Sequence, residues 1–149
     1  MYGKLVNIPR LQAWYGDEGT EYTYSQLQLT PLVWTPPLLK LKQKVSEFCQ
    51  IDFNAMLANC YRDHQDSVSW HSDDEAELGA NPVIASLSFG CQRTFHLKHK
   101  QCNEKFKLPL QSGSLLLMSG DTQKNWSHAI LKTRIEKSVR INLTFRKII

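Results

Sequence analysis

Short apolar or alternating segments, each closed by turn residues, follow one another from residue 53 to the end of the sequence. Alternation of apolar and polar residues is the period of a β-strand, and Gly, Asn, Asp and Ser at the breaks are typical of turns. Strands are expected over Phe53–Arg62, Ser67–Asp73, Pro82–Phe89, Arg93–Lys100, Phe106–Leu110, Ser114–Met118, Trp126–Leu131 and Val139–Ile148, with Tyr22–Leu29 as a further candidate. Short strands at this spacing predict a mainly β fold, which we interpret as one β-sandwich.

One helix is expected ahead of these strands, over about residues 36–50. Thr35 suits the N-cap of this helix, and Pro36 and Pro37 suit its first turn. Apolar residues then recur at helical spacing, at Leu38, Leu41, Val45 and Phe48. We interpret this segment as a supporting helix packed outside the sandwich.

The composition is that of one globular domain: 149 residues, of which 42% are hydrophobic and 21% charged. No apolar run approaches the roughly 18 residues of a membrane span, and Met1–Arg10 lacks the apolar core of a secretory signal. We expect no membrane partner, a monomer, and a cytoplasmic location, or a nuclear one in a eukaryote. The four cysteines show no C-x-x-C spacing, so we expect reduced structural thiols.

The net charge of +4 permits a polyanionic partner without requiring one. Basic side chains gather in residues 93–107, and acidic ones gather in residues 63–77. The basic stretch is either a solvated surface or a contact for phosphates.

His71 and Asp73 are candidate metal ligands. Residues i and i+2 of a strand project from the same face, so the two side chains can reach one ion. A surface histidine beside an acidic loop would produce the same pair. Candidates for a third ligand are His64, His96, His99 and His128. Two histidines and one carboxylate on one face would leave open positions on an octahedral ion, the arrangement of non-haem Fe(II) oxygenases.

The segment Arg140–Arg146 alternates strictly, with Arg140, Asn142, Thr144 and Arg146 on its polar face. It is either an edge strand with a wet face or the wall of a ligand cleft. Arg140 and Arg146 stand roughly 20 Å apart along the strand. In a cleft they require anions, because a buried guanidinium is costly when unpaired. We therefore expect them to clasp the two ends of a short dicarboxylate such as 2-oxoglutarate.

Together these motifs resemble the AlkB family of nucleic-acid demethylases, over about residues 3–148. The resemblance is nearest to the mammalian AlkB homologue that repairs duplex DNA and to its bacterial relatives. The segments that carry it are Pro9–Arg10, Tyr15–Asp17, Tyr22–Ser25, His71–Glu75, Ala85–Gly90 and Arg140–Arg146, with His128 as the distal histidine. The resemblance implies a double-stranded β-helix, or jelly roll, as the catalytic core over residues 53–149, with residues 1–30 as part of a nucleotide-recognition lid.

The resemblance also implies roles for individual residues. His71, Asp73 and His128 would bind Fe(II). The cosubstrate 2-oxoglutarate would be bound by Asn59, Tyr61, Arg140, Asn142 and Arg146. Tyr24 would stack on a flipped base, Glu75 would contact its edge, and Tyr22 would be a further substrate contact. Phosphates would be contacted by Arg10, Arg93, Lys98 and Lys100. Taken singly, each of these residues is also compatible with a polar sheet face or a solvated surface.

The implied reaction is oxidative demethylation of N-alkylated bases such as 1-methyladenine and 3-methylcytosine in DNA. It consumes 2-oxoglutarate and O2 and releases succinate, CO2 and formaldehyde. Only Met1 and Tyr2 stand where the duplex-acting member inserts an apolar finger, and the turn at residues 101–104 is shorter than its DNA-gripping hairpin. Two alternatives stay open: the same chemistry on RNA or a protein side chain, and a nucleic-acid-binding jelly roll without turnover.

Overall fold

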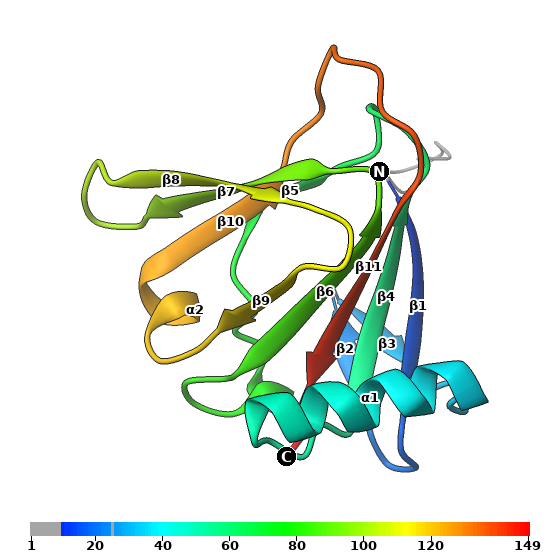
Figure 1. The fold of residues 1–149 in the computed structure, drawn as a ribbon. Helices are drawn as coiled ribbons and strands as arrows, with labels where there is room; N and C mark the ends of the chain where they lie inside the picture. Colours follow the sequence, from blue (N-terminus) through cyan, green and yellow to red (C-terminus); the bar gives the residue numbers. More distant parts are fainter. Residues whose placement is uncertain (1–9, 25) are drawn as a thin grey trace, which may run out of the picture.

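Two antiparallel sheets face each other across the interior of the protein (Figure 1). The structure is a computed structural model that describes residues 10–24 and 26–149, apart from the side chain of Tyr24. The larger sheet has the order β1 (Leu11–Gly16), β4 (Ala55–Tyr61), β11 (Arg140–Arg146), β6 (Ile84–Gly90), β9 (Leu115–Met118). The smaller has the order β5 (Val68–His71), β10 (Trp126–Ile130), β7 (Arg93–His99), β8 (Lys105–Leu110). The predicted β-sandwich is confirmed.

The central strand β11 lies between β4 and β6, so both of its edges are hydrogen-bonded. Its apolar residues Ile141, Leu143 and Phe145 belong to the core between the larger sheet and the helix α1 (Pro36–Cys49). The residues between them therefore face the smaller sheet. Both faces of the strand are covered, and the alternative of an edge strand with a wet face is wrong.

The helix α1 lies across the outer face of the larger sheet (Figure 1). Its observed range, Pro36–Cys49, agrees with the predicted one, and it ends where Gln50 adopts a left-handed conformation at φ 57°. Val45 is buried, and Leu38 and Leu41 pack beside it. Phe48 does not pack against the sheet, because its side chain is 81% exposed. The prediction that it lies on the packed face of the helix is therefore wrong. Helical spacing alone does not show where the sheet beneath a helix ends.

The segment before the helix has two parts. Strand β1 pairs with β4 through all six of its residues and buries Trp14 in the core. Residues 11–16 are therefore an edge strand of the main sheet. The role of residues 1–30 as part of a lid stays a prediction. The hairpin of β2 (Tyr22–Tyr24) and β3 (Leu27–Leu29) forms a separate two-stranded sheet. Met1 and Tyr2 lie outside the described residues.

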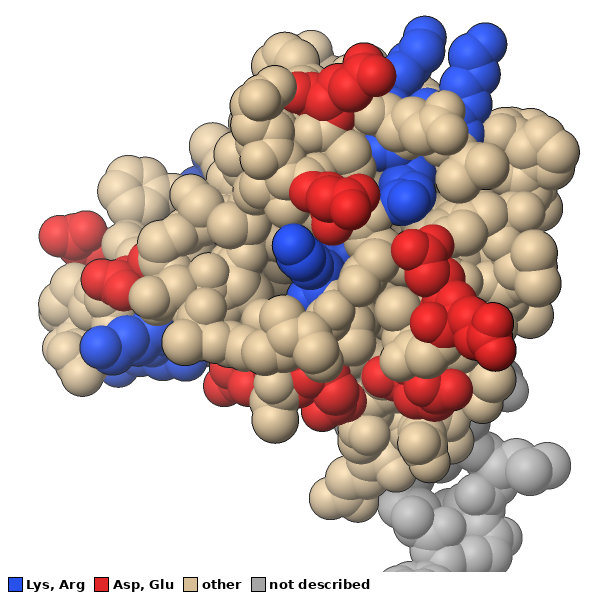
Figure 2. Space-filling view, turned by 90° about the horizontal axis from the view of Figure 1, so that it is seen from below, with Lys and Arg blue, Asp and Glu red and all other residues tan. Residues whose placement is uncertain are grey.

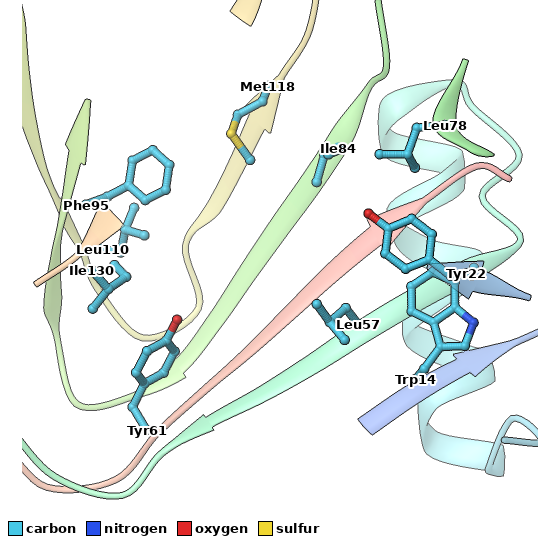
Figure 3. Close-up of a cluster of buried hydrophobic side chains, with 11 residues drawn as sticks. Trp14, Tyr22, Leu57, Tyr61, Leu78, Ile84, Phe95, Leu110, Met118 and Ile130 are labelled. Atoms are coloured by element: carbon cyan, nitrogen blue, oxygen red, sulfur yellow. The ribbon is translucent and has the colours of Figure 1, made fainter. Parts of the chain in front are cut away.

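A cluster of buried apolar side chains fills the space between the sheets. Figure 3 shows the rings of Trp14 and Tyr22 against each other at one end of this cluster. Tyr61, Ile130, Leu110 and Phe95 lie toward the other end. The short helix α2 (Thr122–Asn125) joins β9 to β10, and a 3-10 turn, η1 (Ala76–Leu78), follows β5. Within the described residues, no helix is long and apolar enough to cross a membrane.

Candidate active site

Three candidate metal ligands meet at one edge of the smaller sheet. His71 is the last residue of β5, Asp73 follows it just beyond the strand, and His128 of β10 pairs directly opposite His71. Their ligand atoms all lie within 4.8 Å of one another. Nε2 of His128 is 3.3 Å from Asp73 Oδ2, and Nε2 of His71 is 3.8 Å from Asp73 Oδ1. Among the described residues, this is the one such group of histidine, cysteine and acidic side chains.

The other histidines that the sequence offered as a third ligand lie elsewhere. The ring of His96 packs edge-on against Trp70, and the ring of His99 packs edge-on against Trp126. His64 lies in the turn after β4. The tertiary structure therefore selects His128, because only the strand pairing of β5 with β10 brings a second histidine beside His71.

The charge state of the group suits a divalent cation. Asp73 is 2% exposed, and burial opposes its ionisation, but Arg146 with Nη1 at 3.2 Å and the hydrogen bond with His128 hold the pKa of Asp73 well below its usual range. Burial lowers the pKa of His71 against the opposing effect of Asp73. Nδ1 of His71 donates to the carbonyl of Ser69 at 2.7 Å, which leaves Nε2 as the free lone pair. Two imidazoles with one carboxylate fit Fe(II).

Arg140 lies at the far end of β11 from this group. It is 1% exposed, and its Nη2 donates to Ser88 Oγ at 2.9 Å. Its Nε and Nη1 have no hydrogen-bond partner among the described side chains and backbone. Its guanidinium lies 5.1 Å from the ring centre of Tyr61, and burial lowers its pKa. A buried cation with two unused donors fits a carboxylate, which would accept both hydrogen bonds.

Arg146 has different partners. Besides Asp73, its Nη1 donates to the Tyr22 hydroxyl at 3.1 Å, and Nη2 donates to Thr144 Oγ1 at 3.2 Å. The pKa of Arg146 is raised because Asp73 outweighs the effect of its complete burial. The two arginines therefore differ in their partners. Arg146 is already neutralised by the metal ligand Asp73, whereas Arg140 keeps two donors without a partner among the described residues.

One pocket connects the metal ligands with the polar face of β11. Besides both arginines, the predicted cosubstrate residues Asn59, Tyr61 and Asn142 line it. Asn142 donates to Ser86 Oγ at 2.8 Å. Ser86 and Ser88 had no role assigned from the sequence. Their alternation with Ala85, Leu87 and Phe89 was the signal that could have placed them on the inner face of β6.

The predicted substrate residues lie around the Asp73 end of the site. Tyr22 is fully buried and stacks on Trp14 with ring centres 4.6 Å apart, so its ring offers no free face to a base. Its hydroxyl faces Arg146 and interacts with Glu75. Burial raises the pKa of the half-buried Glu75. The side chain of Tyr24 lies outside the described residues.

Two of the four predicted phosphate contacts are buried instead. Arg93 is 2% exposed and donates to the carbonyls of Asp63, Asp66 and Leu131 at 2.9 to 3.1 Å. Arg10 is 6% exposed, donates to Asn59 Oδ1 at 3.1 Å, and lines the same pocket. Both assignments to a phosphate-binding surface are wrong, because a guanidinium carries five donors that can satisfy interior carbonyls as well as phosphates.

Lys98 and Lys100 remain partly exposed. Nζ of Lys98 lies 4.4 Å from the ring centre of Trp70, and Nζ of Lys100 donates to the carbonyl of Gln123 at 3.0 Å. Lys98 pairs with Lys105, and Lys107 with His96, so these side chains share the outer face of β7 and β8. Their contact with phosphates stays a prediction.

A sandwich of antiparallel sheets that holds two histidines and one carboxylate beside buried arginines defines a non-haem iron oxygenase of the 2-oxo-acid class. Residues 4–146 match the model of the 2OG-Fe(II) oxygenase superfamily, and the chain belongs to this superfamily. Membership of this superfamily, together with the His71, Asp73 and His128 group, confirms the prediction of Fe(II), 2-oxoglutarate and O2 as cofactor and cosubstrates.

Relatives with curated descriptions lie among AlkB homologues, which confirms the predicted resemblance to the AlkB family. Alpha-ketoglutarate-dependent dioxygenase alkB homolog 3 of Mus musculus is 46% identical over 150 residues, which make up 94% of this chain and 52% of that protein. DNA oxidative demethylase ALKBH2 of Mus musculus is 41% identical over 157 residues, with 100% of this chain and 66% of that protein covered. The chain thus spans about half the length of the alkB homolog 3 proteins it matches.

The fold itself is shared with a solved structure of OsALKBH1. The two superpose with a TM-score of 0.62 at 17% identity, over 91% of this chain and 77% of the other. The predicted jelly-roll fold is therefore confirmed.

Proposed function

We propose that this chain is an oxidative DNA demethylase that removes methyl groups from base nitrogens, as in 1-methyladenine and 3-methylcytosine. The observation that carries the proposal is one pocket in which the His71, Asp73 and His128 group meets a buried arginine with unused donors. Similarity to proteins described as DNA oxidative demethylases supports DNA as the substrate. A DNA substrate would place the chain in a bacterial cytosol or a eukaryotic nucleus.

The residues of the pocket would have separate roles in binding the metal and the cosubstrate. His71, Asp73 and His128 would hold Fe(II), while Arg146 keeps Asp73 ionised. Arg140 and Ser88 would hold the distal carboxylate of 2-oxoglutarate. When bound, Fe(II), 2-oxoglutarate and O2 supply the oxidant that hydroxylates the N-methyl carbon, so the products are succinate, CO2, formaldehyde and the unmethylated base. A flipped base is needed, because the methyl group of a stacked base is out of reach.

The lid and the nucleic-acid surface complete the proposal. The β2–β3 hairpin would cover the flipped base with Tyr24, and Glu75 would contact the edge of the base. Lys98 and Lys100 would contact phosphates together with the basic outer face of β7 and β8. Acidic and basic side chains are mixed on the face seen in Figure 2, which gives no continuous basic surface there. We therefore expect the polyanion on the β7–β8 side.

The test measures formaldehyde from oligonucleotides that carry 1-methyladenine or 3-methylcytosine as single-stranded DNA, duplex DNA and RNA. We expect release from single-stranded DNA, dependent on Fe(II) and 2-oxoglutarate, and no release by His71→Ala. Release from RNA alone would replace DNA by RNA as the substrate. No release from any of the three would overturn the proposal.

A further inference from the structure

A buried glutamine holds the backbone of one candidate metal ligand. Gln123 is 2% exposed, and its Oε1 accepts the backbone N–H of Asp73 at 2.7 Å. A backbone N–H can only donate, so this bond also defines which atom of the carboxamide is the oxygen. Nε2 then faces the sulfur of Met118 at 3.6 Å, a weak acceptor. The strong interaction of this side chain is therefore the one with Asp73.

Asp73 needs such support because of where it lies. Strand β5 ends at His71, so the pairing of β5 with β10 does not extend to Asp73. Its carboxylate must nevertheless stay within reach of two imidazoles. Ser72 is tied to the same region, because its Oγ donates to the carbonyl of Trp126 at 2.7 Å. Two successive residues after β5 are thus held by the segment that leads into β10.

Gln123 lies in α2, five residues before His128 on the same continuous segment. It therefore links the segment that carries His128 to the segment that carries Asp73. The helix has an anchor of its own, since Nζ of Lys100 donates to the carbonyl of Gln123 at 3.0 Å. The backbone of Gln123 is thus anchored by Lys100, while its side-chain oxygen accepts the hydrogen bond from Asp73.

We propose that Gln123 is a positioning residue of the metal centre, which sets the distance between Asp73 and His128 through the Asp73 backbone. The proposal rests on the iron site of the proposed function. It assigns no contact between Gln123 and the metal, 2-oxoglutarate or substrate. Groups that orient metal ligands typically change metal affinity by about 10- to 100-fold when they are removed.

The test replaces Gln123 by methionine, which has nearly the same length and volume but no acceptor for the Asp73 N–H. Thr122→Val is the matched control, because it is also isosteric and removes one hydrogen bond of α2, from Thr122 Oγ1 to the carbonyl of Ser119. Co(II) binding to the folded apoprotein is followed by titration and by its ligand-field absorption, without nucleic acid. We expect Gln123→Met to weaken Co(II) binding about tenfold or more and to change the absorption bands. Thr122→Val should stay within about twofold of the wild type.

Gln123→Glu gives a second arm, because it keeps an oxygen acceptor of the same reach. We expect its Co(II) affinity to stay closer to the wild type than that of Gln123→Met. If Gln123→Met binds Co(II) as Thr122→Val does, the residue is structural and the proposal fails. If Gln123→Met does not fold, the test depends on Gln123→Glu. A folded Gln123→Glu that binds Co(II) much more weakly than the wild type would then overturn the proposal. Absence of demethylation would refute the proposed function but leave these affinities untouched.

Discussion

Arg140 and Arg146 occupy one strand but have different partners, and this difference predicts different losses. Arg140→Met removes the two unused donors, so we expect 2-oxoglutarate binding to weaken by about 2 kcal/mol, or about thirtyfold. Metal affinity should hardly change. Arg146→Met leaves the Asp73 carboxylate buried without its cation, which we expect to destabilise the fold by about 3–5 kcal/mol.

Calorimetric titration with 2-oxoglutarate in the presence of Co(II), together with urea unfolding, separates the two effects. Arg134→Met is the control, because Arg134 is an exposed arginine. Equal loss of 2-oxoglutarate binding in both buried variants, with equal stability, would show that the arginines form a symmetric clasp.

Metal binding should persist to a lower pH than an ordinary histidine allows. The neutral imidazole is the ligand, and the pKa of His71 is lowered by burial. Protons therefore begin to compete for Nε2 only below the usual pKa of about 6.5. We expect Co(II) affinity to be flat from about pH 7.5 to 6.5 and to fall below that range. A His71 ring that titrates at or above pH 6.5 in the metal-free protein, followed by NMR, would contradict the lowered pKa.

At the scale of elements, Arg93 ties β7 to the segments after β4 and β10 through three carbonyls. We expect Arg93→Met to destabilise the protein by about 3 kcal/mol in urea unfolding, because buried carbonyls lose their donors. The salt dependence of DNA binding should not change. Lys98→Met should instead leave stability within about 1 kcal/mol and reduce the slope of log K against log salt by about 1. If Arg93→Met instead reduced the salt dependence of DNA binding and left stability unchanged, Arg93 would be a phosphate contact after all.

Most helices and strands could be predicted from local sequence patterns. The helix and most strands were expected within a few residues of their observed ends, because period and turn residues are local properties. Strand β1 was not expected. It is held by its pairing with β4 and by Trp14 in the core, and both are long-range interactions.

At the scale of the molecule, metal should stabilise the fold, because the ligands come from segments about 55 residues apart that only the folded chain brings together. At 100 times the dissociation constant, a bound ion contributes about 2.7 kcal/mol. For a domain of this size, that corresponds to a rise in Tm of about 5–10 °C. We expect Co(II) to give this rise in thermal unfolding and EDTA to reverse it. His71→Ala is the control, and an equal rise in that variant would place the bound metal elsewhere.

The sequence by itself determined the period of each element, the alternation of β11, and a set of residues with metal- and carboxylate-binding chemistry. These are properties of neighbouring residues, so they need no knowledge of the fold. The family resemblance had already named His128 as the third ligand, and the pairing of β5 with β10 shows why it lies beside His71. Only the tertiary structure decided that Arg93 and Arg10 are interior and that Arg146 is neutralised by Asp73. Each of these depends on which strands pair and which faces are covered, and both follow from contacts between residues far apart in the chain.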